Sequence, residues 1–423
     1  MILTDSSKVS TLITYGHSVL SMRNTRNIML VGIDLSSLAI SAKRIGYKVY
    51  TADYYGDIDL RKLSENNISI LNQTQQISSG TFGAQYDPEK FINMVNKLSQ
   101  HIKYDGILLS SGLDDEFNVL AKLNKICRII GNSPEVIKKI RNREHFFSKL
   151  KKLKINQPKT KIIENIDDAI REAKDIGFPN IIKPMSGFGG SGIRKINNIK
   201  QLVKEFQTLF SLGNQQILLQ EFIEGTSTSV SFLASYPKST IISINEQLLG
   251  LESTYQQEPF GYCGNITPYL TNDSTFKKYK KIVNKISKNF NLAGSNGVDI
   301  TLSKDNVPYV IEVNPRFQGS IGCVENVYGI NLVEMHIAAC LQRKLSKKIA
   351  PPSRYSTRLI LYTPKKIIAP NLGSKPYLTD IPFPGSIIEK GEPFCSIFTE
   401  GKTRNQSFSK AKEIANNVYV HIL

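Results

Sequence analysis

Residues that bind transition metals or form disulfides are scarce in this 423-residue chain. It has five cysteines and five histidines. No two cysteines form a CxxC pair, and no two histidines form an HxxxH or HExxH pattern. A zinc site or a disulfide framework is therefore not expected. We expect the thiols to be buried instead: Cys127, Cys263, Cys323, Cys340 and Cys395.

Long apolar runs are also missing. No stretch approaches the roughly 20 residues that a membrane-spanning helix needs. The first 26 residues contain Ser, Thr and Asn and lack the continuous apolar core of a secretory signal. We therefore expect no membrane partner and predict a cytoplasmic protein. Residues 1–26 are either a disordered tail or a consequence of the choice of start codon.

Acidic residues are few relative to basic ones. The chain has 36 Asp and Glu against 54 Lys and Arg, a net charge of +18. This excess indicates either a solvated, lysine-rich surface or attraction to a polyanion or an anionic substrate. The lysines are scattered, and their densest cluster, at 149–154, lacks the interleaved aromatics of single-strand binders. We therefore disfavour a nucleic-acid partner.

The first third of the chain alternates strands with helices, which is typical of a parallel α/β sheet. Strands are expected at 27–34, 48–53 and 106–110, and helices at 36–45, 87–102 and 113–125. The sequence after the first strand, Gly-Ile-Asp-Leu-Ser, is not GxGxxG. An open sheet that forms half of a substrate cleft is therefore favoured over a dinucleotide site.

The rest of the chain divides into three further units. A helix from 134 to about 154 leads into a smaller α+β unit that ends near 225. A larger unit follows to about 350, and a β-rich tail closes the chain with a helix expected at 407–415. Residues 251–268 have no periodicity and are expected to form a long loop, which in compact domains is often functional.

A glycine-rich loop follows the strand that ends at Lys183. Residues 183–192 contain four glycines, and such a loop lets backbone N–H groups close over phosphate oxygens while lysine supplies a point charge. It is not a P-loop, because no GK[ST] follows. A flexible hairpin tip is an equally good interpretation of this stretch alone.

A second motif is the apolar strand at 217–221, which ends in acceptors and a glycine at 225. Such a connector can offer backbone groups to an adenine edge and a carboxylate to ribose hydroxyls. Taken alone, an ordinary exit from a strand is the favoured interpretation.

A third motif places carboxylates on two strands joined by a short turn. The connection at 303–306 brings Asp299 opposite Glu312, and alternation puts Asn314 on the same face. Facing carboxylates repel each other unless a cation lies between them. The residue types therefore predict an Mg²⁺ site completed by phosphates. Arg316 follows at once and could hold a phosphoryl group or a carboxylate.

In this order, the three motifs resemble those of the ATP-grasp superfamily, over about residues 28–345. The tail, with Asp-Ile-Pro-Phe-Pro-Gly at 380–385, resembles the closing domain of archaeal-type carboligases related to biotin carboxylase. The resemblance implies α/β and α+β structure in an ATP-grasp fold. It implies a parallel pre-ATP-grasp domain at 27–132, a lid subdomain with its preceding helix at 133–225, a C-terminal subdomain at 226–350 and a β-rich extension at 351–423.

The resemblance also implies roles for individual residues. ATP phosphates would contact Lys183 and a mobile loop containing Ser186, Gly187, Gly189 and Gly190. The adenosine would be held by Gln220, Glu221, Ile223 and, at the ribose, Glu224. Mg²⁺, for which Mn²⁺ could substitute, would be bound by Asp299, Glu312 and Asn314. The catalytic residues would be Arg316 and Asn314.

One departure from the family concerns the helix before the lid. The family commonly has an Asp-Lys pair where this chain has Asn142 and Arg143. Arginine keeps the positive charge but changes the geometry. We expect Arg143 to be a phosphate ligand.

The resemblance implies an ATP-dependent carboxylate–amine ligase that forms an acyl phosphate and releases ADP and phosphate. Its partners would be a small carboxylate and an amine, contacted by residues 258–265 and 318–320, and a homodimer is left open. Two alternatives remain. One is a bicarbonate-dependent carboxylase of the biotin-carboxylase type, and the other is a basic nucleic-acid-binding protein with a degenerate ATP-grasp fold.

Overall fold

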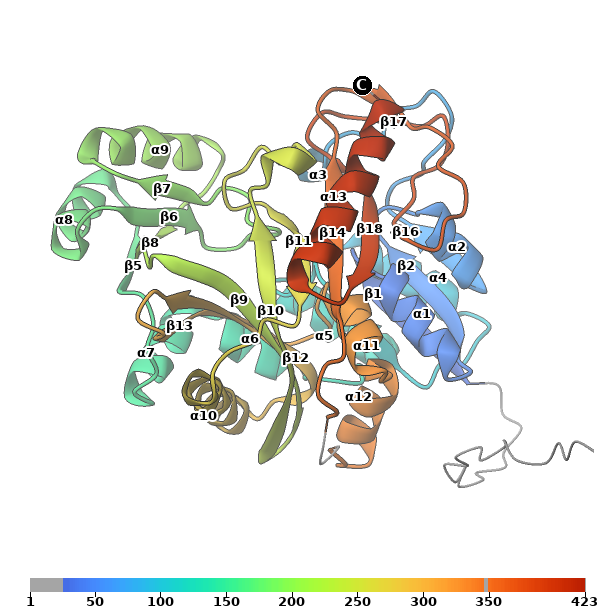
Figure 1. The fold of residues 1–423 in the computed structure, drawn as a ribbon, viewed down its shortest axis with the longest axis horizontal. Coiled ribbons are helices and arrows are strands. Elements are labelled where there is room, and N and C mark those ends of the chain that lie inside the picture. The colour runs from blue at the N-terminus through green and yellow to red at the C-terminus, as the bar shows by residue number, and fades with distance from the viewer. Residues whose placement is uncertain (1–25, 346–348, 423) are drawn as a thin grey trace, which may run out of the picture.

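The computed structural model describes residues 26–345 and 349–422, which form four sheets with flanking helices (Figure 1). The N-terminal sheet is parallel and has the order β3-β2-β1-β4. The parallel pairing of these strands, with helices between them along the chain, confirms the parallel α/β sheet expected from the sequence. The bounds are β1 Asn27–Gly32, β2 Lys48–Asp53, β3 Asn66–Ser69, β4 Ile107–Leu109, α1 Ser36–Arg44, α2 Ile58–Leu63, α3 Phe82–Gln85, α4 Lys90–Ser99 and α5 Phe117–Ile126.

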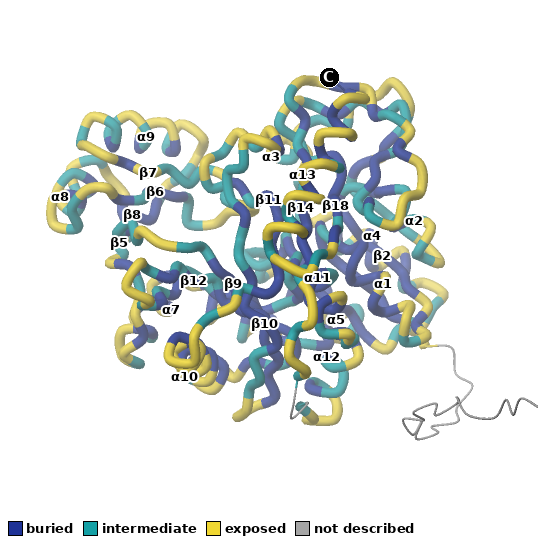
Figure 2. Tube along the Cα trace, in the orientation of Figure 1, coloured by how far each residue is buried: buried dark blue, intermediate teal, exposed yellow. Residues whose placement is uncertain are grey.

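The region predicted to form the lid contains a separate antiparallel sheet with the order β5-β8-β6-β7. It has its own small core, which includes Ile182, Phe206 and Leu219. It projects to the left of the rest of the molecule in Figure 1, and its outer surface is largely exposed in Figure 2. The bounds are β5 Thr160–Ile163, β6 Asn180–Pro184, β7 Arg194–Ile196, β8 Ile217–Glu221, α8 Ile166–Ile176 and α9 Ile199–Ser211.

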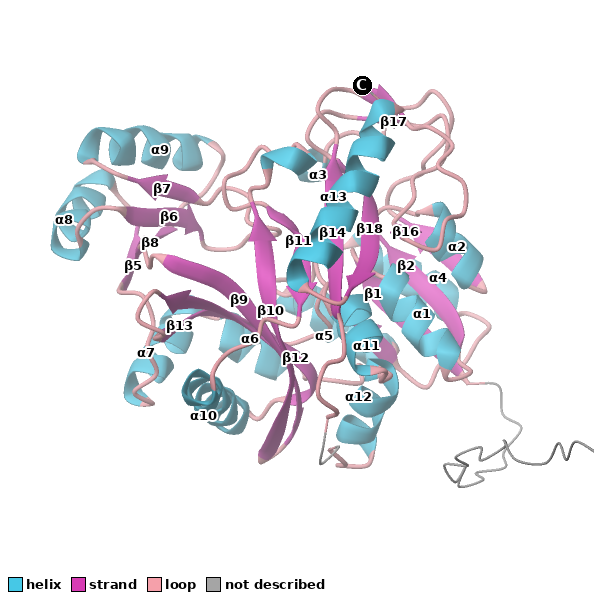
Figure 3. Ribbon diagram, viewed as in Figure 1, coloured by secondary structure: helices cyan, strands magenta, loops and turns pink. Residues whose placement is uncertain are grey.

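The largest sheet has eight strands in the order β13-β12-β9-β10-β11-β14-β18-β16. Helix α10 covers part of one face (Figure 3). The bounds are β9 Gly225–Ser235, β10 Lys238–Leu249, η1 Glu252–Thr254, β11 Tyr262–Thr267, α10 Asp273–Phe290, β12 Ala293–Ser303, β13 Pro308–Asn314, α11 Ile321–Tyr328, α12 Leu332–Leu341, β14 Tyr355–Tyr362, β15 Ile367–Ile368, β16 Leu378–Thr379, β17 Ile387–Ile388, β18 Pro393–Gly401 and α13 Arg404–Val420. The remaining two strands, β15 and β17, pair as a small ribbon.

The C-terminal extension continues this large sheet. Strand β14 pairs with β11, and one hydrophobic cluster contains Leu248 and Ile266 together with residues of β14, β18 and α13. The extension is therefore packed into the same core as the preceding unit. The division of the chain into domains at 132, 225 and 350 stays a prediction.

Three sequence-based expectations about elements were wrong. The single helix expected from 134 to 154 is two helices, α6 Pro134–Arg141 and α7 Arg143–Lys152, because Asn142 ends the first and caps the second by accepting from the His145 N–H at 2.8 Å. The expected loop at 251–268 contains β11, an interior strand of the large sheet. The last helix runs from Arg404 to Val420 rather than over 407–415, and Thr403 caps its first turn by accepting from the Gln406 N–H.

The tail expected at residues 1–26 lies, apart from Arg26, outside the described residues. Within the described part of the chain, none of the helices combines the length and the apolar character needed to cross a membrane.

A buried histidine joins α12 to β12 and to the segment that follows α5. The Nδ1 of His336 accepts the N–H of Ser295 at 2.8 Å, and its Nε2 lies 2.9 Å from the Ile130 carbonyl. Burial lowers the pKa of His336 from 6.5 to about 4. The folded protein therefore keeps this ring neutral at pH values where the unfolded chain protonates it.

Stability should accordingly fall as the pH drops from 6.5 toward 4. Between pH 7 and pH 5, wild type should lose about 2 kcal/mol more unfolding free energy than His336→Gln, which has no imidazole to protonate. Urea titrations of both proteins at the two pH values measure this. Parallel losses in the two proteins would show that His336 is not the group responsible.

Candidate active site

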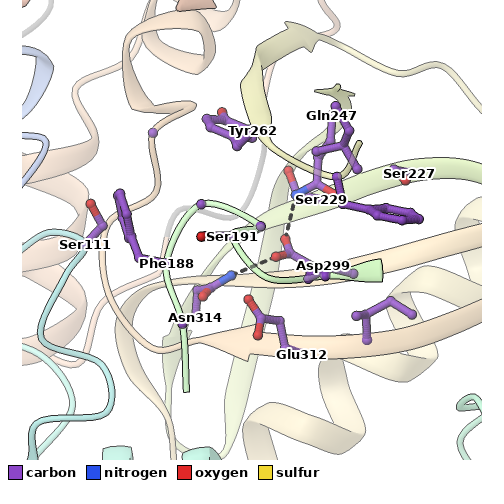
Figure 4. Close-up of a pocket in the computed structure, with 18 of the residues that line it drawn as sticks. Ser111, Phe188, Ser191, Ser227, Ser229, Gln247, Tyr262, Asp299, Glu312 and Asn314 are labelled. Atoms are coloured by element: carbon purple, nitrogen blue, oxygen red, sulfur yellow. Dashed lines mark hydrogen bonds between the residues drawn. The ribbon is translucent and has the colours of Figure 1, made fainter. Parts of the chain in front are cut away.

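A cavity of about 570 Å³ opens where the N-terminal sheet, the lid and the large sheet meet. One part is lined by the lid, by β12 and β13 and by the segment that follows β13. The other part is lined by the carboxyl ends of N-terminal strands and by the C-terminal extension. Ligands commonly bind at the carboxyl ends of strands in open α/β sheets. Figure 4 shows a close-up of this cavity.

The β12–β13 hairpin places the two predicted metal-binding carboxylates opposite each other. The strand register pairs Asp299 with Glu312, as the sequence predicted. The Asn314 amide donates to Asp299 at 3.0 Å, and the Gln247 amide donates to the other Asp299 oxygen at 3.1 Å (Figure 4). Two carboxylates and an amide oxygen are hard ligands that suit Mg²⁺ with phosphates and water. Their role as metal ligands stays a prediction.

Four cations surround Glu312. Burial opposes its ionisation, but Arg141, Arg143, Lys183 and Arg316 outweigh burial and lower the pKa of Glu312 to about 2. The guanidiniums of Arg141 and Arg143 each lie 3.4 Å from Glu312 Oε2. Glu312 therefore holds together a cluster of positive charges that otherwise repel one another.

Its neighbour Asp299 behaves in the opposite way. Burial, together with the charge of Glu312, raises the pKa of Asp299 to about 7. When two carboxylates lie close together, one pKa is commonly raised and the other lowered. A divalent cation between them would neutralise both.

Lys183 and Arg143 lie side by side under the glycine loop. Lys183, the penultimate residue of β6, is 9% exposed. Burial and the neighbouring Arg143 lower the pKa of Lys183 to about 8. Arg143 begins α7 and donates to the Met185 carbonyl at 3.2 Å. This concentration of buried positive charge suits the phosphates of a nucleotide.

Sequence reasoning missed Arg141. It is the last residue of α6, and its guanidinium makes two hydrogen bonds of 2.7 Å with Asp115 as well as the contact with Glu312. The kink at Asn142 turns Arg141 and Arg143 toward the same carboxylate. The sequence offers no local signal for this arrangement, because both partners of Arg141 come from other elements.

The glycine loop is folded over the cavity and is held at two points. Ser186, Gly187, Gly189 and Gly190 all line the cavity. The Tyr262 N–H donates to the Gly189 carbonyl at 2.9 Å. Gly190 has a φ of +84°, and a Cβ there would lie 2.0 Å from the Phe260 carbonyl oxygen. Only glycine fits this close approach.

An aromatic contact also joins the glycine loop to the N-terminal unit. The ring of Phe188 stacks on Phe82 of α3, with centroids 5.5 Å apart and an angle of 25° between the planes. Phe82 in turn stacks on Tyr86 at 4.9 Å. The loop thus closes against two different parts of the molecule.

The connector after β8 reaches the cavity in part. Gln220, Glu221 and Ile223 line it, and the Gln220 amide donates to Thr160 Oγ1 at 2.8 Å. Glu224 is not among the lining residues. Its exposed side chain pairs with Lys304 at 2.7 Å. The expected contact of Glu224 with a ribose stays a prediction and requires the side chain to leave Lys304.

Arg316 is anchored beside the carboxylate pair. Its Nε lies 3.1 Å from both carboxylate oxygens of Asp114, and its Nη2 donates to Asn314 Oδ1 at 3.4 Å. These contacts fix the guanidinium in the wall of the cavity, which residues 318–320 also line.

Sequence comparison identifies relatives of this chain. A model of the ATP-grasp domain matches residues 140–320. An uncharacterized protein of Methanocaldococcus jannaschii is 30% identical over 395 residues, which are 92% of this chain and 90% of that protein. The carbamoyl phosphate synthase large chain of Thermoplasma volcanium is 24% identical over 72% of this chain. The matched region spans only 29% of that large chain.

Solved structures show the same fold at low identity. The biotin carboxylase domain dimer of Hydrogenobacter thermophilus 2-oxoglutarate carboxylase, in complex with MgADP, ADP and bicarbonate, has a TM-score of 0.69 and 16% identity, covering 92% of this chain and 89% of that one. The L-amino acid ligase of Bacillus licheniformis has a TM-score of 0.68 and 16% identity, covering 93% and 98%. With coverages of 92% and 93% of this chain, both similarities extend well beyond the residues 140–320 that the domain model matches.

Proposed function

Because this chain belongs to the ATP-grasp superfamily, we propose that it is an ATP-dependent carboxylate–amine ligase that works through an acyl phosphate. The observation that carries the proposal is the facing pair of Asp299 and Glu312 within a cluster of buried cations at one cavity. The structural neighbours of this chain include an L-amino acid ligase. We further propose a cytoplasmic enzyme and leave a homodimer open.

The residues of the cavity divide the chemistry between them. Lys183 and Arg143 bind the phosphates, backbone N–H groups of the glycine loop close over them, and Arg316 orients the donor carboxylate. Asp299, Glu312 and Asn314 would hold Mg²⁺ or Mn²⁺, which neutralises charge on the phosphate oxygens when bound.

The reaction then has two steps. A carboxylate oxygen of the donor attacks the γ-phosphorus and the bond to ADP breaks, giving an acyl phosphate. The nitrogen of the amine attacks the acyl carbon, loses a proton and expels phosphate, giving an amide. Positioning and charge neutralisation supply most of the rate acceleration in such transfers.

The experiment that tests this function measures ADP release with panels of carboxylic acids and amines in the presence of Mg²⁺. We expect at least one pair in which ADP release requires both components and in which an amide accumulates in equal amount. ADP release that depends on bicarbonate and needs no amine would select the carboxylase function instead. Binding of duplex DNA without any thermal shift by Mg-ATP would overturn both.

The contact between Phe188 and Phe82 predicts how well the lid protects the acyl phosphate. Phe188→Leu should increase ADP release that is not matched by amide, because a weaker stack lets water reach the intermediate. The stack is worth about 1 kcal/mol, so the expected increase is roughly 2- to 10-fold.

A double-mutant cycle isolates this contact. Phe82→Leu should give a similar increase, and the double variant should be no worse than either single variant. Fully additive effects would mean that the two rings do not act through each other.

A further inference from the structure

The end of the cavity away from the nucleotide site is rich in carboxylates. Asp34, Asp57 and Asp380 line it. Of the cavity-lining Arg and Lys residues in the described part of the chain, Arg358 alone forms ion pairs with these carboxylates. This excess of negative charge contrasts with the cationic cluster around Glu312 and with the net charge of the chain, +18.

Every N–H group of the Arg358 guanidinium donates a hydrogen bond to another group of the protein. Its Nη1 donates to Asp34 and to the Gly319 carbonyl, its Nη2 donates to Asp34 and Asp380, and its Nε donates to Ser396. A guanidinium has five N–H groups, and these contacts use all of them. Arg358 therefore positions two carboxylates and has no donor left for the carboxylate of a substrate.

Asp57 has unused hydrogen-bonding capacity. Asp57 is 8% exposed, and it lies at the N-cap of α2 without making a cap hydrogen bond. Its Oδ1 accepts from the Gln73 amide at 3.3 Å. Its Oδ2 has no donor anywhere in the described part of the chain. Burial and the nearby Asp380 and Asp59 raise the pKa of Asp57 well above its ordinary value, because its negative charge is poorly solvated and faces other carboxylates.

This acidic end is directly connected to the reacting centre. Gly319 follows Arg316 by three residues, and a Cβ at Gly319 would lie 3.0 Å from Arg358 Nη1 and 3.1 Å from Asp34 Oδ2. A molecule that enters between the C-terminal extension and the N-terminal sheet therefore approaches Arg316 along the segment 318–320.

We propose that the acceptor substrate is a cationic amine, whose ammonium group is bound by Asp57 together with Asp34 and Asp380. This inference rests on the proposed ligase function and adds the charge of the acceptor to it. An acceptor that carries a phosphate or an excess of carboxylates would meet buried negative charge without a free cation to pair with it.

Binding of simple isosteres tests the charge preference without knowledge of the donor acid. Diaminoalkanes of three to six carbons are compared with the corresponding diols and dicarboxylates by isothermal titration calorimetry, with the full chain in Mg²⁺ and a non-hydrolysable ATP analogue. We expect at least one diamine to bind and the diol and dicarboxylate of the same length to bind at least tenfold more weakly. Binding of a dicarboxylate in preference to every diamine, or of no diamine at all, would overturn the proposal.

Asp57→Asn tests the residue, because asparagine keeps the shape and the Gln73 contact but removes the charge. Loss of a buried charge-assisted contact should weaken diamine binding about 10- to 100-fold and leave the affinity for the ATP analogue unchanged. Asp175→Asn, on the exposed surface of α8, is the matched control. Asp380→Asn provides a second variant in case Asp57→Asn does not fold. Unchanged diamine binding in a folded Asp57→Asn protein would overturn the assignment of the ammonium site to Asp57.

These outcomes separate the two proposals. ADP release with anionic acceptors only would leave the ligase function standing and remove the cationic acceptor. Diamine binding through Asp57 without ADP release from any pair of acid and amine would support the cationic site and remove the ligase function.

Discussion

Replacing Glu312 with Gln should lower Mg-ATP-dependent ADP release by about 10²- to 10³-fold, the range seen when one preorganised electrostatic contact is removed from an active site. Glutamine keeps the size of the side chain but removes the charge that balances Arg141, Arg143 and Lys183. It also leaves Asp299 as the only carboxylate of the hairpin pair. The Mg²⁺ concentration that gives half-maximal rate should therefore rise together with the loss of rate.

Glu144→Gln is the matched control for this prediction. Glu144 is exposed in the first turn of α7, one residue from Arg143, and its replacement removes an equal charge without touching the cavity. We expect its rate to be within twofold of wild type. A folded Glu312→Gln protein that turns over normally would show that the metal site has been assigned to the wrong residues.

Lys183→Met should lose activity and gain stability at the same time. We expect kcat/KM for ATP to fall about 100-fold, because a buried, charge-assisted contact with a phosphate is lost. The folded protein also pays to keep this lysine charged, since burial and Arg143 lower its pKa from 10.5 to about 8. Removing it should raise the unfolding free energy by up to about 3 kcal/mol at pH 7.

The pH dependence of the unfolding free energy distinguishes the removal of a buried charge from the stabilisation that any buried apolar side chain provides. The unfavourable contribution of Lys183 is fully present below pH 8, where the lysine is protonated in both states. It decreases as the pH rises from 8 to 10.5 and is absent above 10.5, where the lysine is deprotonated in both states. The stability difference between Lys183→Met and wild type should therefore shrink over that interval. Lys204→Met, on an exposed position of α9, is the control and should show no such trend. A destabilised Lys183→Met protein would contradict the explanation.

Some parts of the site could be predicted from the sequence because they depend on local geometry. Alternation along a strand fixes which side chains share a face, and a short turn fixes which residues of the two strands meet. These two rules are sufficient to place Asp299 opposite Glu312. The glycines at 187–192 likewise indicate a loop that approaches other backbone closely, and Gly190 does so at Phe260.

Other parts could not be predicted, because their partners lie far apart in the chain. The segment 251–268 lacks periodicity, yet β11 within it is buried between β10 and β14 and takes its hydrogen bonds from both. The break at Asn142 has the same character. Nothing in the helical pattern of 134–154 requires this break. Because of it, Arg141 and Arg143 both contact Glu312, which lies about 170 positions later in the chain.

The sequence by itself determined the parallel N-terminal sheet, the carboxylate hairpin and the glycine loop, because each follows from the spacing of neighbouring residues. Only the tertiary structure decided which charges share the cavity. The contact between Arg358 and Asp34 spans 324 residues, and it exists because β14, which carries Arg358, joins the large sheet beside β11 while Asp34 follows the carboxyl end of β1. Packing of distant elements, rather than local pattern, thus made one end of the cavity cationic and the other acidic.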